Sequence, residues 1–155
     1  MYLYLVRHGD AATKEADGTR SLTEMGRAES ERVARWLARV LTCRAPHVFH
    51  SEKALAAQTA GIIAKHFRSA KLEADRDLVP DADPALWVKR LGKSASDVVL
   101  VGHFPHLNRL ASRLITGHAE PLVIALEKSG VACLVRDDNR NWALCWLVQP
   151  SVLGT

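Results

Sequence analysis

Two histidines in this 155-residue chain directly follow short apolar runs. His8 comes after Tyr-Leu-Tyr-Leu-Val-Arg, and His103 comes after Val-Val-Leu-Val-Gly. A neutral imidazole is a nucleophile toward phosphorus, a protonated one donates to phosphate oxygens, and the guanidinium of Arg7 offers those oxygens a planar fork. Gly9 would let the backbone approach an anion closely. These residue types therefore predict phosphoryl chemistry, provided that the fold brings the two histidines together.

The hydrophobic pattern predicts elements that would do so. Continuous apolar runs are typical of strands covered on both faces, and ligands bind at the carboxyl ends of such strands. Amphipathic helical spacing separates these runs. The expected strands are 2–6, 48–51, 98–101 and two strands within 131–148, and the expected helices are 23–41, 52–67, 83–92 and 107–116. This alternation predicts a three-layer α/β/α fold, one domain spanning 1–155, with a mainly parallel sheet, helices on both faces and a C-terminal β-hairpin.

The expected hairpin contains two of the three cysteines. If Arg136 pairs with Trp142, Cys133 faces Cys145 across it. A disulfide there and two reduced thiols are both compatible with the sequence. An odd number of cysteines at no metal-like spacing favours reduced thiols, a reducing compartment and no zinc site.

The charge pattern excludes several classes of partner. The net charge is only +4, and the arginines of the 23–41 helix are interleaved with glutamates, which is typical of a solvated face and not of a nucleic-acid-binding stripe. The N-terminal apolar run is too short for a signal segment or a membrane span. We therefore expect a soluble cytoplasmic protein that binds neither nucleic acid nor membrane.

Four motifs in order resemble the histidine phosphatase superfamily, also called phosphoglycerate mutase-like. The resemblance runs from about residue 3 to residue 116. The opening and the His-x-Pro element are most similar to the SixA-type phosphohistidine phosphatase branch. The motifs are Leu-Val-Arg-His-Gly-Asp-Ala-Ala at 5–12, Arg-Ser-Leu-Thr at 20–23 with Gly26, Ser51 with Gln-Thr-Ala at 58–60, and Val-Gly-His-Phe-Pro at 101–105.

The resemblance assigns roles to matching residues. It implies that His8 is the nucleophile that becomes phosphorylated, that Arg7 binds the phosphoryl group and that His103 stabilises the transition state. A phosphate or sulfate anion would occupy this site, with Ser51 and Gly9 beside it. No metal or organic cofactor is implied. Arg20 either contacts the substrate at the mouth of the site or fixes the loop before the first helix.

Two positions depart from the family pattern. Leu55 stands where the family has a second phosphate-binding arginine, and loss of one such donor typically costs roughly 10²–10³ in rate. Lys53 either replaces that charge or is a surface lysine, although an ammonium cannot reproduce the bidentate fork. Asp77 aligns with a Glu-x-Leu-x-Pro element of relatives and is either the general acid or an exposed turn residue.

The leading hypothesis for function is removal of phosphate from phosphohistidine on a partner protein. Little more than one small helix is expected between Phe67 and Val98, so the site should lack a lid and admit a protein surface. The alternatives are a small-molecule phosphomonoesterase acting on a phosphate ester, and a catalytically impaired relative that binds phosphate or a phosphoprotein because of Leu55.

Overall fold

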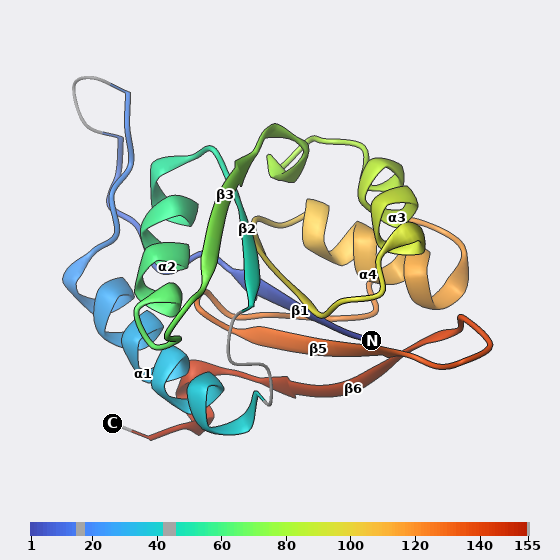
Figure 1. The fold of residues 1–155 in the computed structure, drawn as a ribbon. Coiled ribbons are helices and arrows are strands. Elements are labelled where there is room, and N and C mark those ends of the chain that lie inside the picture. Colours follow the sequence, from blue (N-terminus) through green and yellow to red (C-terminus); the bar gives the residue numbers. More distant parts are fainter. Residues whose placement is uncertain (15–17, 42–45, 155) are drawn as a thin grey trace.

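The computed structural model describes residues 1–14, 18–41 and 46–154. In this part of the chain a six-stranded sheet has the strand order β3-β2-β4-β1-β5-β6 (Figure 1). The first four strands in that order run parallel to one another. Strand β5 runs antiparallel to β1, and β6 runs antiparallel to β5. The strands are β1 Tyr2–Arg7, β2 His47–Ser51, β3 Lys71–Asp75, β4 Val98–Gly102, β5 Val131–Arg136 and β6 Trp142–Val148. The predicted mainly parallel sheet with a C-terminal hairpin is thus confirmed.

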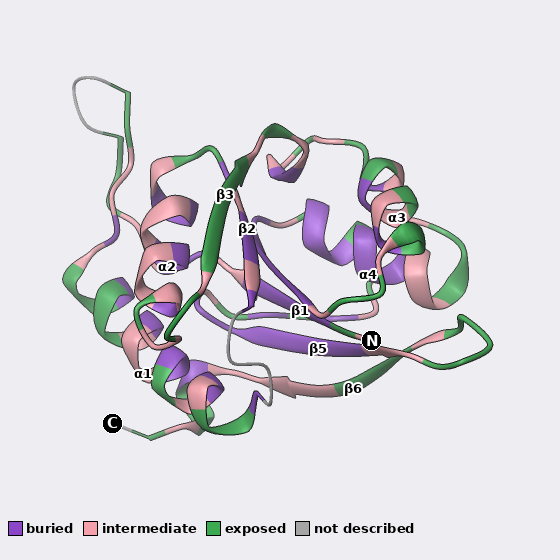
Figure 2. Cartoon of the chain, in the orientation of Figure 1, coloured by how far each residue is buried: buried purple, intermediate pink, exposed green. Residues whose placement is uncertain are grey.

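Helices cover both faces of the sheet, so the three-layer prediction is also confirmed (Figure 1). Each face of the sheet has its own hydrophobic core, and alternate residues of β1 belong to different cores. Leu5 packs with α3 and α4, and Val6 packs with α1 and α2. Figure 2 shows the central strands as the most buried part of the sheet. The elements that surround it are α1 Glu24–Val40, α2 Ala54–Ala64, α3 Pro84–Lys93, α4 His106–Thr116 and the 3-10 turns η1 Arg76–Leu78 and η2 Pro150–Val152.

Local capping chemistry fixes most helix ends. Thr23 accepts a hydrogen bond from the backbone of Gly26 at 3.0 Å, and Gly117 ends α4 in the left-handed conformation with φ 82°. Asp83 caps α3 as expected, but the helix continues one residue beyond Gly92. The helix expected at 52–67 is shorter, because Lys53 is its N-cap and the chain turns after Ala64.

Strand β3 is missing from the sequence-based prediction. It pairs in parallel with β2 at the sheet edge, with Leu72 opposite Val48. Most of its residues are exposed, because an edge strand has a neighbour on one side only. The segment is only five residues long, and its polar-apolar alternation rests on Leu72 and the small Ala74 between three charged residues, so the strand signal was weak.

The hairpin register differs from the expected one near the cysteines. Arg136 pairs with Trp142 as predicted, but a β-bulge shifts the register between Cys133 and Leu134, so Cys133 pairs with Trp146. The predicted register was wrong by one residue at Cys133, but the Cys145 thiol still lies beside the Cys133 thiol and, after burial, contributes to raising its pKa. The bulge places the Trp146 ring against Trp36, with the centroids 5.1 Å apart. Cys133 and Cys145 are both free thiols, and burial raises the pKa of Cys133 to about 12; Cys43 lies outside the described residues.

None of the described helices combines the length and apolar character needed to cross a membrane.

Candidate active site

The sheet places the two histidines side by side. Strands β1 and β4 are parallel neighbours with Arg7 opposite Gly102, so His8 and His103 follow at the same sheet edge. Their ring centroids are 4.9 Å apart, and only 8% and 5% of their surfaces are exposed. The His8 backbone N–H donates to the Gly102 carbonyl at 3.0 Å, which joins the two strand ends directly.

The ring of His8 is held by its own chain neighbour. Its Nδ1 lies 2.8 Å from the Gly9 carbonyl oxygen. A carbonyl can only accept, so Nδ1 carries the proton and Nε2 keeps a free lone pair. Burial is the main cause of a lowered His8 pKa, and the positive charges of Arg7, Lys128 and Arg20 lower it further. At neutral pH the ring is therefore uncharged, and its free lone pair lies on Nε2.

His103 is positioned by a buried hydroxyl. Its Nε2 lies 2.9 Å from Oγ of Ser51, which is itself fully buried and accepts from the Lys53 backbone N–H at 3.3 Å. Burial, followed by the charges of His8 and Lys53, lowers the His103 pKa to about 4. The ring is thus neutral at neutral pH in the anion-free site, whereas a bound phosphate dianion would favour its protonation. Ser51 orients His103 and does not line the cavity described below.

Arg7 leaves part of its guanidinium unused. Nη1 donates to the Leu126 carbonyl at 2.7 Å, and the guanidinium carbon lies 5.0 Å from the centroid of the Phe104 ring. Nε is buried and has no hydrogen-bond partner among the described residues. Buried donors are normally paired, so this nitrogen is consistent with an anion-binding role for Arg7.

Gly9 is needed for a different reason from the one expected. Its N–H already donates to Oγ1 of Thr59 at 3.0 Å, which leaves none for an anion. A side chain at Gly9 would place its Cβ 2.7 Å from Oγ of Ser30 and 3.0 Å from the Gly26 carbonyl. The glycine therefore lets α1 pack closely against the loop that carries His8.

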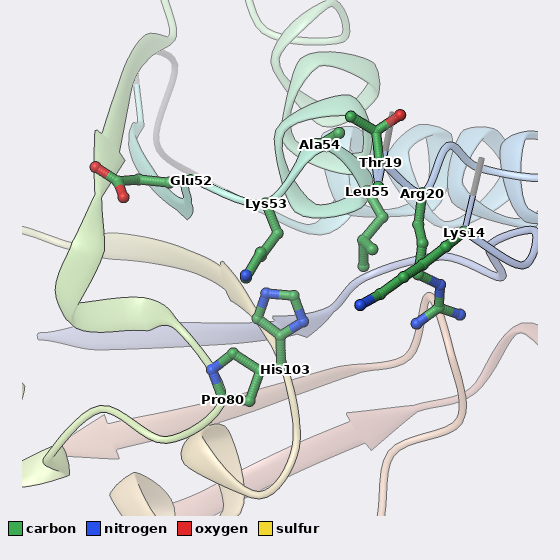
Figure 3. Close-up of a pocket in the computed structure, with 10 residues that line it drawn as sticks. Lys14, Thr19, Arg20, Glu52, Lys53, Ala54, Leu55, Pro80 and His103 are labelled. Atoms are coloured by element: carbon green, nitrogen blue, oxygen red, sulfur yellow. The ribbon is translucent and has the colours of Figure 1, made fainter. Parts of the chain in front are cut away.

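A cavity of about 480 Å³ opens beside His103 (Figure 3). Figure 3 shows the charged ends of Lys14, Arg20 and Lys53 gathered on the side of His103, whereas the Glu52 carboxylate points away. Ala54, Leu55 and Pro80 add apolar groups to the wall. The cavity is lined by Lys14, Gly18, Thr19, Arg20, Glu52, Lys53, Ala54, Leu55, Pro80 and His103.

The position of Arg20 is compatible with both roles that the sequence left open. Its Nε donates to the Ala12 carbonyl at 3.0 Å, so it fixes the loop before α1. It also lines the cavity, and its positive charge lowers the pKa of both catalytic-site histidines. The same side chain is therefore available to an anion.

Asp77 is placed less favourably for proton transfer. It is half-buried in η1 and is not among the cavity-lining residues of the described chain. Its negative charge acts on His106, a fully buried residue whose two ring nitrogens have no partner among the described residues. A general-acid role for Asp77 stays a prediction.

The sequence reasoning missed two lysines of the site. Lys14 lines the cavity, and Lys128 donates to Oδ1 of Asp10 at 2.6 Å and lowers the His8 pKa through its charge. Both are single basic residues in loops, and neither belongs to a motif. The described residues hold no cluster of three or more His, Cys, Asp or Glu side chains that could bind a metal ion.

The comparisons agree with this geometry. A family model described as the histidine phosphatase superfamily (branch 1) matches residues 3–79. The solved structure of the protein histidine phosphatase SixA complexed with tungstate shares 27% identity, with a TM-score of 0.82 over 99% of both chains. No curated protein sequence matches the chain.

Further solved structures show the same fold. A candidate SixA phosphohistidine phosphatase from Agrobacterium tumefaciens is 25% identical, with a TM-score of 0.76 over 95% of this chain and 96% of that one. The alpha-ribazole phosphatase from Shigella flexneri is 16% identical, with a TM-score of 0.77 over 95% and 96%. The fold is thus found in proteins named for different phosphorylated substrates.

Proposed function

Since the chain belongs to the histidine phosphatase superfamily, we propose that it is a phosphatase whose intermediate is a phosphohistidine on His8. The observation that carries this proposal is the fixed tautomer of His8. Nδ1 is bound to the Gly9 carbonyl, so Nε2 has its lone pair free, beside the buried His103 and the partly unpaired Arg7.

The reaction takes two displacements at phosphorus. In the first, Nε2 of His8 forms a bond to phosphorus while the bond to the leaving group breaks, and the leaving group takes up a proton. In the second, water forms a new P–O bond, the P–N bond breaks, and the water proton passes to solvent or to the leaving phosphate. Arg7 and His103 stabilise the charge on the phosphoryl oxygens in both steps.

The substrate that fits best is phosphohistidine on a partner protein. Its leaving imidazole is protonated readily by solvent, so this reaction depends least on a dedicated acid such as Asp77. Lys53 and Gly18 line the cavity and are exposed, so the cavity is accessible from outside. Similarity to a SixA protein histidine phosphatase supports the same choice.

Two alternatives rest on specific observations. A cavity of about 480 Å³ has the size of a small-molecule site, which favours a phosphomonoesterase. Leu55 contributes an apolar side chain to the same wall, where the family pattern has an arginine, which favours a phosphate-binding relative with little turnover.

The first experiment compares hydrolysis of a histidine-phosphorylated protein with that of p-nitrophenyl phosphate. We expect wild-type turnover of the phosphohistidine to exceed that of the ester, and His8→Ala to lower kcat by at least about 10³-fold because the nucleophile is gone. An acid-labile phosphoenzyme should accumulate in wild type and be absent from His8→Ala.

His118→Ala is the matched control, because His118 lies in an exposed loop. Equal turnover by wild type and His8→Ala would refute the covalent mechanism. Faster turnover of the ester would favour a small-molecule phosphomonoesterase. Phosphate binding without turnover would favour the catalytically impaired relative.

A further inference from the structure

The segment that precedes β5 lies directly against the chain that carries His8. The Ser129 backbone N–H donates to the carbonyl oxygens of Arg7 and His8, both at 3.1 Å. The Gly130 carbonyl accepts from the Arg7 backbone N–H at 3.0 Å, and the Leu126 carbonyl accepts from the Arg7 guanidinium at 2.7 Å. A charge carried by this segment is therefore close to the place where the phosphoryl group would bind.

One side chain of this segment, Lys128, forms an ion pair with the loop after His8. Its Nζ donates to Oδ1 of Asp10 at 2.6 Å, and Asp10 is only two residues beyond His8. Burial is the main cause of the lowered His8 pKa, and the charge of Lys128 contributes to it. The ion pair thus belongs to the surroundings of the active site and not to a remote surface.

Other contacts hold Asp10 in place without Lys128. Oγ1 of Thr23 donates to Oδ2 of Asp10 at 2.8 Å, and the Thr23 backbone N–H donates to the Asp10 carbonyl at 2.9 Å. The side chains of Lys128 and Asp10 are 40% and 22% exposed, and partly exposed ion pairs add little to stability. What Lys128 supplies beyond these contacts is a positive charge next to the carboxylate.

An uncompensated carboxylate at Asp10 would oppose the binding of a phosphoryl group. The phosphoryl group is itself negatively charged, and like charges at short range repel one another even in partly solvated protein. A lysine ammonium bound to the carboxylate cancels most of this repulsion, because the two charges of the pair act on the phosphoryl group with opposite signs.

We propose that Lys128 is a positioning residue of the active site that acts through Asp10: it engages this carboxylate and compensates its charge, so that the site can bind a phosphoryl dianion. The inference rests on the proposed function, because it assumes that the phosphoryl group lies at Arg7 and His8. It predicts opposite effects for the two partners of the ion pair, since loss of the lysine leaves a negative charge and loss of the carboxylate leaves a positive one.

Tungstate is the probe, because it is a tetrahedral dianion like phosphate, and calorimetry at slightly alkaline pH measures its dissociation constant. Lys128→Met should raise the dissociation constant about fivefold, because one negative charge near the anion becomes uncompensated. Asp10→Asn should lower it about threefold, since the amide keeps an oxygen for Thr23 but carries no charge. The double variant should bind tungstate within about twofold of wild type.

Two measurements separate charge from structure. Lys128→Arg should keep the wild-type dissociation constant, because it keeps the positive charge. Raising the salt concentration from about 0.05 M to about 0.5 M should reduce the effects of both single variants, since salt screens exposed charges and does not restore a lost contact. A purely structural role predicts instead that both single variants bind tungstate more weakly and that the double variant does not recover, which would overturn the inference.

Lys71→Met is the matched control. Lys71 forms an exposed ion pair with Glu73 on the edge strand, with 3.7 Å between Nζ and Oε2. It lies at the start of β3, whereas the site lies beyond the ends of the parallel strands β1 and β4. Its dissociation constant for tungstate should equal that of wild type. Equal weakening by Lys71→Met and Lys128→Met would show that net charge alone matters and would overturn the inference.

The inference and the proposed function fail differently. Tungstate binding needs no turnover, so absence of His8-dependent hydrolysis would refute the phosphatase and leave the charge effect measurable. Arg7→Gln should weaken tungstate binding at least about tenfold, because a charged donor to the anion is lost. No tungstate binding by wild type, binding that Arg7→Gln does not weaken, or unchanged affinity in Lys128→Met and Asp10→Asn would overturn the inference whatever the turnover.

Discussion

One carbonyl oxygen determines which nitrogen of His8 is available for chemistry. The Gly9 oxygen accepts from Nδ1 at 2.8 Å and thereby leaves Nε2 unprotonated. The N–H of the same residue donates to Oγ1 of Thr59 at 3.0 Å, which holds Gly9 in place. The His8 ring is therefore oriented by a backbone carbonyl, and the Thr59 hydroxyl holds the residue that carries that carbonyl.

At the residue scale, Leu55 gives the sharpest prediction. Leu55→Arg would place a guanidinium in the cavity wall, where its fork can bind two phosphoryl oxygens. We expect kcat/KM for the phosphohistidine substrate to rise, by up to about 10²-fold, because a preorganised donor to developing charge is typically worth that much.

Leu55→Met is the control for packing, and its kcat/KM should equal that of wild type. Single-turnover kinetics will show whether the gain is in the chemical step. A Leu55→Arg variant no faster than wild type would mean that Lys53 and Arg20 already supply the charge that the second family arginine provides.

The contact between α1 and the loop after β1 shapes the site at the scale of elements. Gly26 is in the first turn of α1, and its Cβ, if present, would lie 2.1 Å from the carbonyl oxygen of Asp10. Gly9 faces the same turn from the other side. Two glycines therefore set the distance between α1 and the chain that carries His8.

Gly26→Ala should consequently destabilise the protein. The overlap is with backbone, which cannot rotate away, so we expect the free energy of unfolding to fall by about 3 kcal/mol or more. Kcat should also fall, since the loop that follows His8 must shift. Urea unfolding at pH 7 measures the first effect.

Gly61→Ala is the counterpart in α2. A Cβ added at Gly61 would meet no neighbouring group within 4 Å. Alanine also has the higher helix propensity, so the free energy of unfolding should rise by about 0.5–1 kcal/mol. Equal effects of the two substitutions would show that the close approach of α1 is not what requires Gly26.

Buried histidines make the stability of the folded protein depend on pH. Burial is the main cause of the lowered pKa values of His103 and His106, both about 4, against an ordinary value of 6.5. Between pH 6.5 and 4 the unfolded chain therefore binds protons that the folded chain does not. Stability must fall as the pH falls through this window, by at most about 1.4 kcal/mol per pH unit for each histidine.

His106→Leu should reduce this dependence. Asp75, Asp77 and Asp83 raise the pKa of the ring and Arg109 lowers it, but burial dominates. The loss of unfolding free energy from pH 7 to pH 5 should be smaller in the variant by roughly 1–2 kcal/mol. Urea unfolding at both pH values measures it, with His118→Leu as the exposed control. An unchanged difference would mean that His106 is protonated in the folded protein.

The sequence by itself determined the architecture, because continuous apolar runs and capping residues are local signals. The runs before His8 and His103 predicted two buried strands, and Thr23 and Gly117 predicted helix ends that the structure contains. Edge strand β3 escaped prediction because it is short and mostly exposed, and only Leu72 and Ala74 mark its apolar positions.

Only the tertiary structure decided which residues meet. The bulge that moves Cys145 out of its expected pairing brings Trp146 against Trp36 of α1 and Tyr4 of β1. Lys14 and Lys53 are far apart in the chain and share a cavity because the loops after β1 and β2 open at the same sheet edge. Such contacts depend on the order of strands in the sheet, which local sequence patterns do not encode.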